Sequence, residues 1–229
     1  MNKNLITPNR KELTWGLRYL LFQAIFLGSL IVLAARLFGI AINATWLNII
    51  YFTVNFVAVV LLCRRYLRNT MAWGLQSLGR NLGLAAGGFL VYQTASVMLA
   101  MVIVMVQPDF GNVNDQALSA MSQDNFALMA FCTVLLVPLT EEILYRGIVF
   151  GGLYFRNRWL AYGVSVLVFS LIHVSGYIGS ADPLTLLLCF SQYIPAGLCL
   201  AFVYERSGSL LPSVLIHTAV NAIGMLAMR

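Results

Sequence analysis

Two adjacent carboxylates and an arginine stand inside an apolar stretch of this chain. Glu141, Glu142 and Arg146 fall within residues 126–155, and most of the remaining residues of this stretch are apolar. A charged side chain near the centre of a lipid bilayer costs about 2.5–3.5 kcal/mol on insertion scales. Three ionisable groups so close together in such a segment therefore indicate a specific structural or chemical role.

The spacing of these charges predicts different roles for the two glutamates. Glu142 and Arg146 are four residues apart, so a helix stacks them on one face, where they form an ion pair. Adjacent residues on an α-helix point about 100° apart, so we expect Glu141 and Glu142 to share no partner. Glu142 is then structural, and Glu141 is free for chemistry. Pairs of this kind also hold membrane helices together or line transport pathways, so the motif alone does not decide between these functions.

The two histidines of the chain both fall in apolar segments. Phe169 precedes His173 by one helical turn and packs against it, and Asn221 follows His217 by one turn on the same face. Counted along their helices, these groups and Glu141 reach similar depths in the membrane. A carboxylate, two imidazoles and an amide in one cavity supply a base for water and donors for an oxyanion, as a hydrolase requires.

Three motifs occur in order along the second half of the chain: Glu-Glu-x-x-x-Arg from residue 141, Phe-x-x-x-His from 169 and His-x-x-x-Asn from 217. Together with the Gly-Ser-Leu-Leu-Pro segment before His217, they resemble the CPBP intramembrane proteases. This family includes CAAX prenyl endopeptidases and the Abi proteins of bacteriocin processing and immunity. The resemblance covers residues 126–228, and the preceding residues match only in being helical membrane segments.

The resemblance implies a role for each matching residue. Glu141 would activate the hydrolytic water with the help of His173, and His217 and Asn221 would stabilise the oxyanion or complete the site. Supporting roles would fall to Glu142, Arg146 and Phe169. The implied substrate is a membrane-associated peptide or protein, and the implied location is a bacterial plasma membrane. The alternatives are a non-catalytic scaffold or immunity regulator on the same fold and a small proton-coupled transporter.

Zinc is an alternative to a metal-free site. Glu141, His173 and His217 could ligate zinc and leave a fourth position for water. These ligands come from three separate helices and lack the H-E-x-x-H spacing of many zinc proteases. We therefore expect no cofactor, with zinc as the alternative.

The elements that carry these residues are transmembrane helices. Of the 229 residues, 60% are hydrophobic and only 10% charged, far below the roughly 25% of soluble domains. The composition predicts an all-α polytopic membrane protein. Its four cysteines are scattered through apolar segments, as expected of buried free thiols.

Apolar runs predict seven spans and three regions. The regions are a basic tail (1–18), accessory helices and loops (19–125) and a catalytic membrane core (126–229). The spans are expected at about 19–35, 45–63, 82–106, 126–155, 159–177, 184–204 and 210–228. A short interfacial helix is expected at 71–78, a polar loop at 108–123, a kink or a freed carbonyl at Pro138 and a close helix contact at Gly83 and Gly87.

The loop charges predict the orientation. Arginines concentrate in the tail, in residues 64–80, after the fourth span and at Arg206, and aspartates concentrate in the loops on the opposite side. The positive-inside rule then places the amino terminus in the cytoplasm and the carboxyl terminus outside. The net charge of +6 is explained by topology, so we expect no nucleic acid partner.

Overall fold

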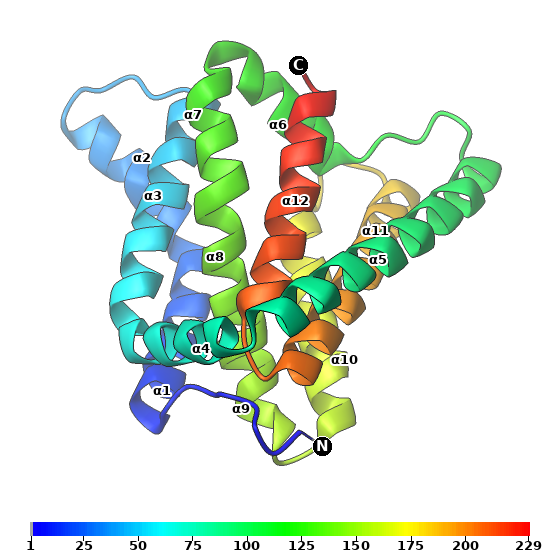
Figure 1. Cartoon of the computed structure of the whole chain (residues 1–229). Coiled ribbons are helices and arrows are strands. Elements are labelled where there is room, and N and C mark those ends of the chain that lie inside the picture. The colour runs from blue at the N-terminus through cyan, green and yellow to red at the C-terminus, as the bar shows by residue number, and fades with distance from the viewer. Residues whose placement is uncertain (1) are drawn as a thin grey trace.

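The computed structural model describes residues 2–229, and these form an all-α membrane protein (Figure 1). In residues 2–229 there is no strand beyond one isolated bridge between Ile178 and Ala181. The first half contains α1 Arg10–Phe22, π-helical η1 Gln23–Leu27, α2 Gly28–Leu37, α3 Ala44–Leu62, α4 Arg64–Gln76, α5 Leu78–Val106 and α6 Val113–Asp124. The second half contains α7 Phe126–Phe131, η2 Cys132–Leu136, α8 Val137–Glu141, η3 Glu142–Phe150, α9 Gly151–Tyr154, α10 Arg158–Ser175, α11 Pro183–Ser207 and α12 Leu211–Ala227.

Six continuous helices are long and apolar enough to cross a membrane. They are Arg10–Leu37, Ala44–Leu62, Leu78–Val106, Phe126–Tyr154, Arg158–Ser175 and Pro183–Ser207. The seventh expected span is α12, an apolar helix of 17 residues that is shorter than the other six. The amino-terminal and carboxyl-terminal ends of the chain lie at opposite ends of the bundle (Figure 1).

The first helix begins within residues 1–18, which were expected to form a tail outside the first span. Within residues 2–18 the chain is already helical from Arg10, and Met1 lies outside the described residues. Asn9 caps this helix in a capping box with Glu12, which satisfies amides of the first turn. The second carboxylate oxygen of Glu12 accepts a hydrogen bond from the Tyr66 amide at 2.8 Å. The start of α1 is thereby joined to the start of α4.

The fourth span is the most deeply packed of the long helices. Half of its most apolar 18-residue stretch is buried inside the protein, whereas only 6% of the corresponding stretch of α5 is buried. Helix α5 therefore faces outward along most of its length. All nine residues of η3 are buried. Two π-helical segments interrupt this helix: η2 ends at Leu136, two residues before Pro138, which has no amide to donate, and η3 begins at Glu142. The expected distortion at Pro138 is therefore a π-helical segment in an otherwise continuous helix.

Two elements differ from their expected extents. The interfacial helix is α4, which lies across the bundle (Figure 1) and begins at Arg64 rather than near Met71. The expected polar loop contains the helix α6, which Asn112 caps through the amides of the first turn. Hydrogen bonds join α6 to its neighbours: Asn112 donates to Gln192 at 2.7 Å, and Thr45 donates to Asp124 at 2.7 Å. A fixed helix therefore replaces the expected loop.

The close helix contact on α5 is made by a glycine other than those expected. A methyl group added at Gly83 or at Gly87 would meet no atom within 4 Å. One added at Gly88 would lie 2.8 Å from side-chain carbons of Val203 and Ile216, on α11 and α12. The expectation was wrong because small-residue spacing identifies a helix but not the side of it that meets a neighbour.

Adjacent glycines on α5 supply a matched test of this packing. We expect Gly88→Leu to lower the stability of the purified protein by about 1–3 kcal/mol, because the added atoms overlap Val203 and Ile216. Gly87→Leu adds the same atoms on an open face and should leave the melting temperature in detergent near that of the wild type. Equal melting temperatures for the two variants would contradict the packing of α5 against α11 and α12.

Candidate active site

The four candidate catalytic side chains line one cavity of about 690 Å³. Glu141 comes from α8, His173 from α10, and His217 and Asn221 from α12. These elements are far apart in the sequence and close in the fold, as the convergence of the three motifs predicted. The roles of the four residues in catalysis stay a prediction.

Glu142 and Arg146 form the predicted ion pair. Oε1 of Glu142 lies 3.2 Å from Nη1 of Arg146, and both side chains are fully buried. The guanidinium makes no hydrogen bond within residues 2–229, but it lies over the ring of Phe169, with Cζ 4.4 Å from the ring centroid. The buried positive charge is therefore balanced by one carboxylate and one aromatic face.

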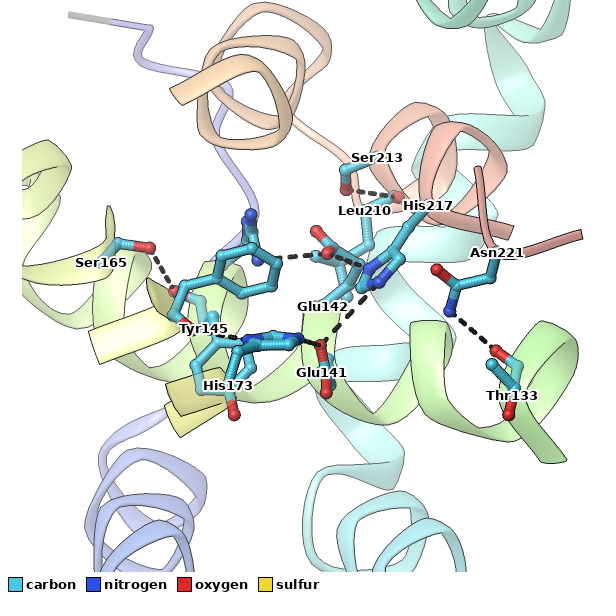
Figure 2. A network of polar contacts seen from close by, with 12 residues as sticks. Thr133, Glu141, Glu142, Tyr145, Ser165, His173, Leu210, Ser213, His217 and Asn221 are labelled. Carbon is cyan, nitrogen blue, oxygen red and sulfur yellow. Dashed lines mark hydrogen bonds and ion pairs between the residues drawn. The ribbon is translucent and has the colours of Figure 1, made fainter. Parts of the chain in front are cut away.

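His217 joins the two glutamates that were expected to have no common partner. Its Nδ1 lies 2.9 Å from Oε1 of Glu142, and its Nε2 lies 3.8 Å from Oε2 of Glu141 (Figure 2). The expectation was wrong because an imidazole has nitrogens on two edges of its ring, so one ring reaches two side chains that diverge from adjacent positions. Glu142 consequently orients a residue of the cavity besides pairing with Arg146.

Hydrogen-bond partners assign the proton on each imidazole. Nδ1 of His173 lies 2.7 Å from the Phe169 carbonyl oxygen, which only accepts, so this nitrogen carries the hydrogen. The ionised Glu142 likewise accepts from Nδ1 of His217. In the neutral form of each ring, Nε2 then presents a lone pair toward Oε2 of Glu141, 3.8 Å away in both cases. That carboxylate oxygen has no hydrogen-bond partner in residues 2–229.

Aromatic rings hold the two imidazoles in place. The ring of Phe169 lies 4.7 Å from that of His173 and 6.1 Å from that of His217, between centroids. The packing of Phe169 against His173 is therefore confirmed. Tyr193 on α11 stacks on the ring of His173, with centroids 4.2 Å apart and planes 26° from parallel, and it also contacts Phe169 edge to face. Tyr193 was not among the candidate residues, because no motif links it to the histidines.

Asn221 is held by a backbone group rather than by the other candidate residues. Its Nδ2 donates to the carbonyl of Thr133 at 2.8 Å (Figure 2). Thr133 belongs to η2, so the π-helical segment before Pro138 supplies the partner of this amide. The bond fixes the orientation of the carboxamide and leaves its second N–H for a ligand.

Helix α6 contributes polar residues to the same cavity, which were not among the candidates. Asn112, Asn114 and Asp115 line it together with Gln192 of α11. The lining includes two carboxylates, those of Glu141 and Asp115, and no lysine or arginine. A polar segment predicted as a loop offered no signal that it would cover a site in the membrane.

A carboxylate and two imidazoles match the chemistry of zinc ligands. In the described part of the chain, however, no three His, Cys, Asp or Glu side chains are grouped as they would be around a metal ion.

A known protein family matches the second half of the chain. The family described as type II CAAX prenyl endopeptidase Rce1-like matches residues 123–223, which contain all three motifs. The resemblance predicted from the motifs is confirmed, and at the level of the family it supports an intramembrane protease.

Two bacterial relatives cover most of the chain. The UPF0177 protein YxdF of Lactococcus lactis subsp. lactis (strain IL1403) is 27% identical over 173 residues, which are 72% of this chain and 85% of that protein. The protein named "Putative membrane peptidase YdiL" of Bacillus subtilis (strain 168) is 27% identical over 180 residues, 76% of this chain and 68% of that protein. No solved structure matches the chain.

The buried ion pair predicts a stability defect that a second substitution relieves. Glu142→Gln can still accept from His217 but leaves Arg146 without its carboxylate, a loss of about 3–5 kcal/mol for a fully buried pair. Glu142→Gln combined with Arg146→Met removes the lone charge and should recover part of the lost melting temperature in detergent. A single variant as stable as the wild type, or a double variant less stable than the single, would contradict the pairing.

Proposed function

We propose that this chain, a relative of the Rce1-like membrane endopeptidases, hydrolyses a peptide bond of a membrane-associated peptide or protein in a bacterial plasma membrane. One observation carries the proposal: two imidazole nitrogens face the same unpartnered oxygen of Glu141, at 3.8 Å each, inside a cavity of the membrane domain. A structural ion pair has no need of such an arrangement, whereas it suits a site in which a carboxylate and an imidazole hold a water between them.

In the proposed reaction Glu141 is the general base. A separation of 3.8 Å is too long for a direct hydrogen bond, so a water between Glu141 and His173 can donate one proton to each acceptor. Glu141 removes a proton as the water oxygen attacks the carbonyl carbon of the peptide bond. The same proton then passes to the amine nitrogen, the C–N bond breaks, and a carboxylic acid and an amine leave, the acid losing its remaining proton to the amine or to water.

The other two residues act on the carbonyl oxygen of the substrate. Asn221 has one N–H left after its bond to Thr133, and this hydrogen can donate to the oxyanion that forms during attack. His217 can donate from Nε2 to the same oxyanion when both nitrogens of its ring carry a hydrogen, since its Nδ1 is already bound to Glu142. Phe169 and Tyr193 keep the imidazole of His173 from rotating away.

Substitution of the proposed base tests this function. We expect Glu141→Gln to reduce cleavage of membrane-anchored reporter peptides by about 10²–10⁴-fold, because the amide keeps the shape but accepts no proton. Its melting temperature should remain near that of the wild type, because Oε2 of Glu141 makes no hydrogen bond that the substitution removes. Product fragments are measured by mass spectrometry on purified protein in lipid nanodiscs.

Asp109→Asn is the matched control, since Asp109 is exposed and lies outside the cavity lining. It should cleave at the wild-type rate. A Glu141→Gln variant that cleaves normally would refute the role of Glu141. A wild-type protein that cleaves none of a broad panel of anchored peptides would favour the scaffold or transporter alternatives.

Metal removal tests the proposal that water is activated without zinc. We expect cleavage to persist after exhaustive chelation and elemental analysis to find far less than one zinc per chain. The measurement compares initial rates before and after chelation and again after zinc is added back. Activity that chelation abolishes and zinc restores would overturn this part of the proposal and make Glu141, His173 and His217 ligands.

A further inference from the structure

A second pocket lies beside the amino-terminal segment, since Asn2 and Asn4 line it, and it shares no lining residue with the cavity of the candidate active site. Its volume is about 370 Å³. Three arginines, one carboxylate and a tryptophan are among the side chains that line it: Arg80, Arg158, Arg206, Glu205 and Trp73. None of these residues lines the cavity of Glu141.

The single carboxylate of this pocket is already neutralised. Glu205 accepts hydrogen bonds from Tyr154 at 2.7 Å and from Tyr162 at 2.6 Å. Arg158 donates to it at 3.0 Å from Nη2 and places Nε 2.9 Å from its other oxygen. The charge of Arg158 is therefore balanced by Glu205, and neither is left to balance the other arginines.

Arg80 and Arg206 carry charges that no carboxylate balances. Across residues 2–229 neither forms an ion pair. Both are nevertheless held in position: Arg80 donates from Nη2 to the Arg206 carbonyl at 2.7 Å, and the Arg206 guanidinium lies 5.1 Å from the ring centroid of Phe202. Each retains several N–H donors, and prearranged guanidinium groups suit the oxygens of a phosphate.

The position of the pocket points to a lipid as the source of that phosphate. Its arginines stand at helix ends, with Arg80 near the start of α5, Arg158 at the start of α10 and Arg206 near the end of α11. Helix ends lie at the membrane–water boundary, where tryptophan is also enriched. Trp73 belongs to α4, the helix that lies across the bundle. The positive-inside rule predicts that this boundary is the cytoplasmic one, where anionic lipids concentrate.

We propose that this pocket binds the phosphate of an anionic phospholipid headgroup through Arg80 and Arg206. Arg158 and Glu205 form its neutral wall, and Trp73 borders it at headgroup level. The site is independent of peptide hydrolysis, because it lies outside the cavity and uses none of the candidate catalytic residues.

Lipid binding to the purified full-length chain tests the site. Phosphatidylglycerol should bind with higher affinity than phosphatidylcholine, as measured by native mass spectrometry and by the rise in melting temperature on titration. Arg80→Gln with Arg206→Gln should weaken phosphatidylglycerol binding about thirtyfold, the effect expected when two arginines are lost near a charged surface. Arg64→Gln with Arg65→Gln removes two exposed charges of α4 outside the pocket and should retain wild-type binding.

Two further measurements separate lipid binding from misfolding and from the binding of a soluble anion. Arg80→Lys with Arg206→Lys retains both charges and should bind within a few-fold of the wild type, which separates lost charge from lost folding. Inorganic phosphate and glycerol 1-phosphate should not displace the lipid at equal concentration. Equal weakening by the two glutamine pairs, or equal affinity for both lipids, would overturn the proposal. Displacement by free phosphate would show that the pocket takes a soluble anion instead.

Discussion

The second half of this protein depends on the balance of one buried positive charge. Arg146 is fully buried in the central helix, where an unpaired guanidinium would destabilise the fold by several kcal/mol. Glu142 supplies the balancing carboxylate from the same helix, and Phe169 covers the guanidinium from α10. The same carboxylate accepts a hydrogen bond from His217 on α12. One charge requirement thus holds three segments of the chain in register.

That register also sets the geometry of the candidate active site. Since Glu142 accepts from Nδ1 of His217, the other nitrogen of the ring is directed toward Glu141. His173 reaches the same oxygen from α10, with its own Nδ1 bound to a backbone carbonyl. The protonation pattern needed at the site therefore follows from contacts outside the reacting atoms, which is how preorganised sites are generally built.

Backbone irregularity has a local use in this fold. The π-helical segment η2 precedes a proline and offers the Thr133 carbonyl to Asn221, so the break in one helix orients a side chain of another. Segments of this kind are rare and often occur at functional sites. Helix α6 lines another part of the cavity and is held there by hydrogen bonds to α3 and α11. Elements from both halves of the chain therefore line the site.

The sequence by itself determined the membrane class, the helical fold, the Glu142–Arg146 pair and the residues that meet in the cavity. Hydropathy and the four-residue spacing of helices act locally, so a linear pattern reports them. The common partner of Glu141 and Glu142, the stacking of Tyr193 on His173, the helix α6 and the contact at Gly88 were decided only by the tertiary structure. Each depends on which face of one helix meets another, and that choice is set by packing between segments distant in the sequence.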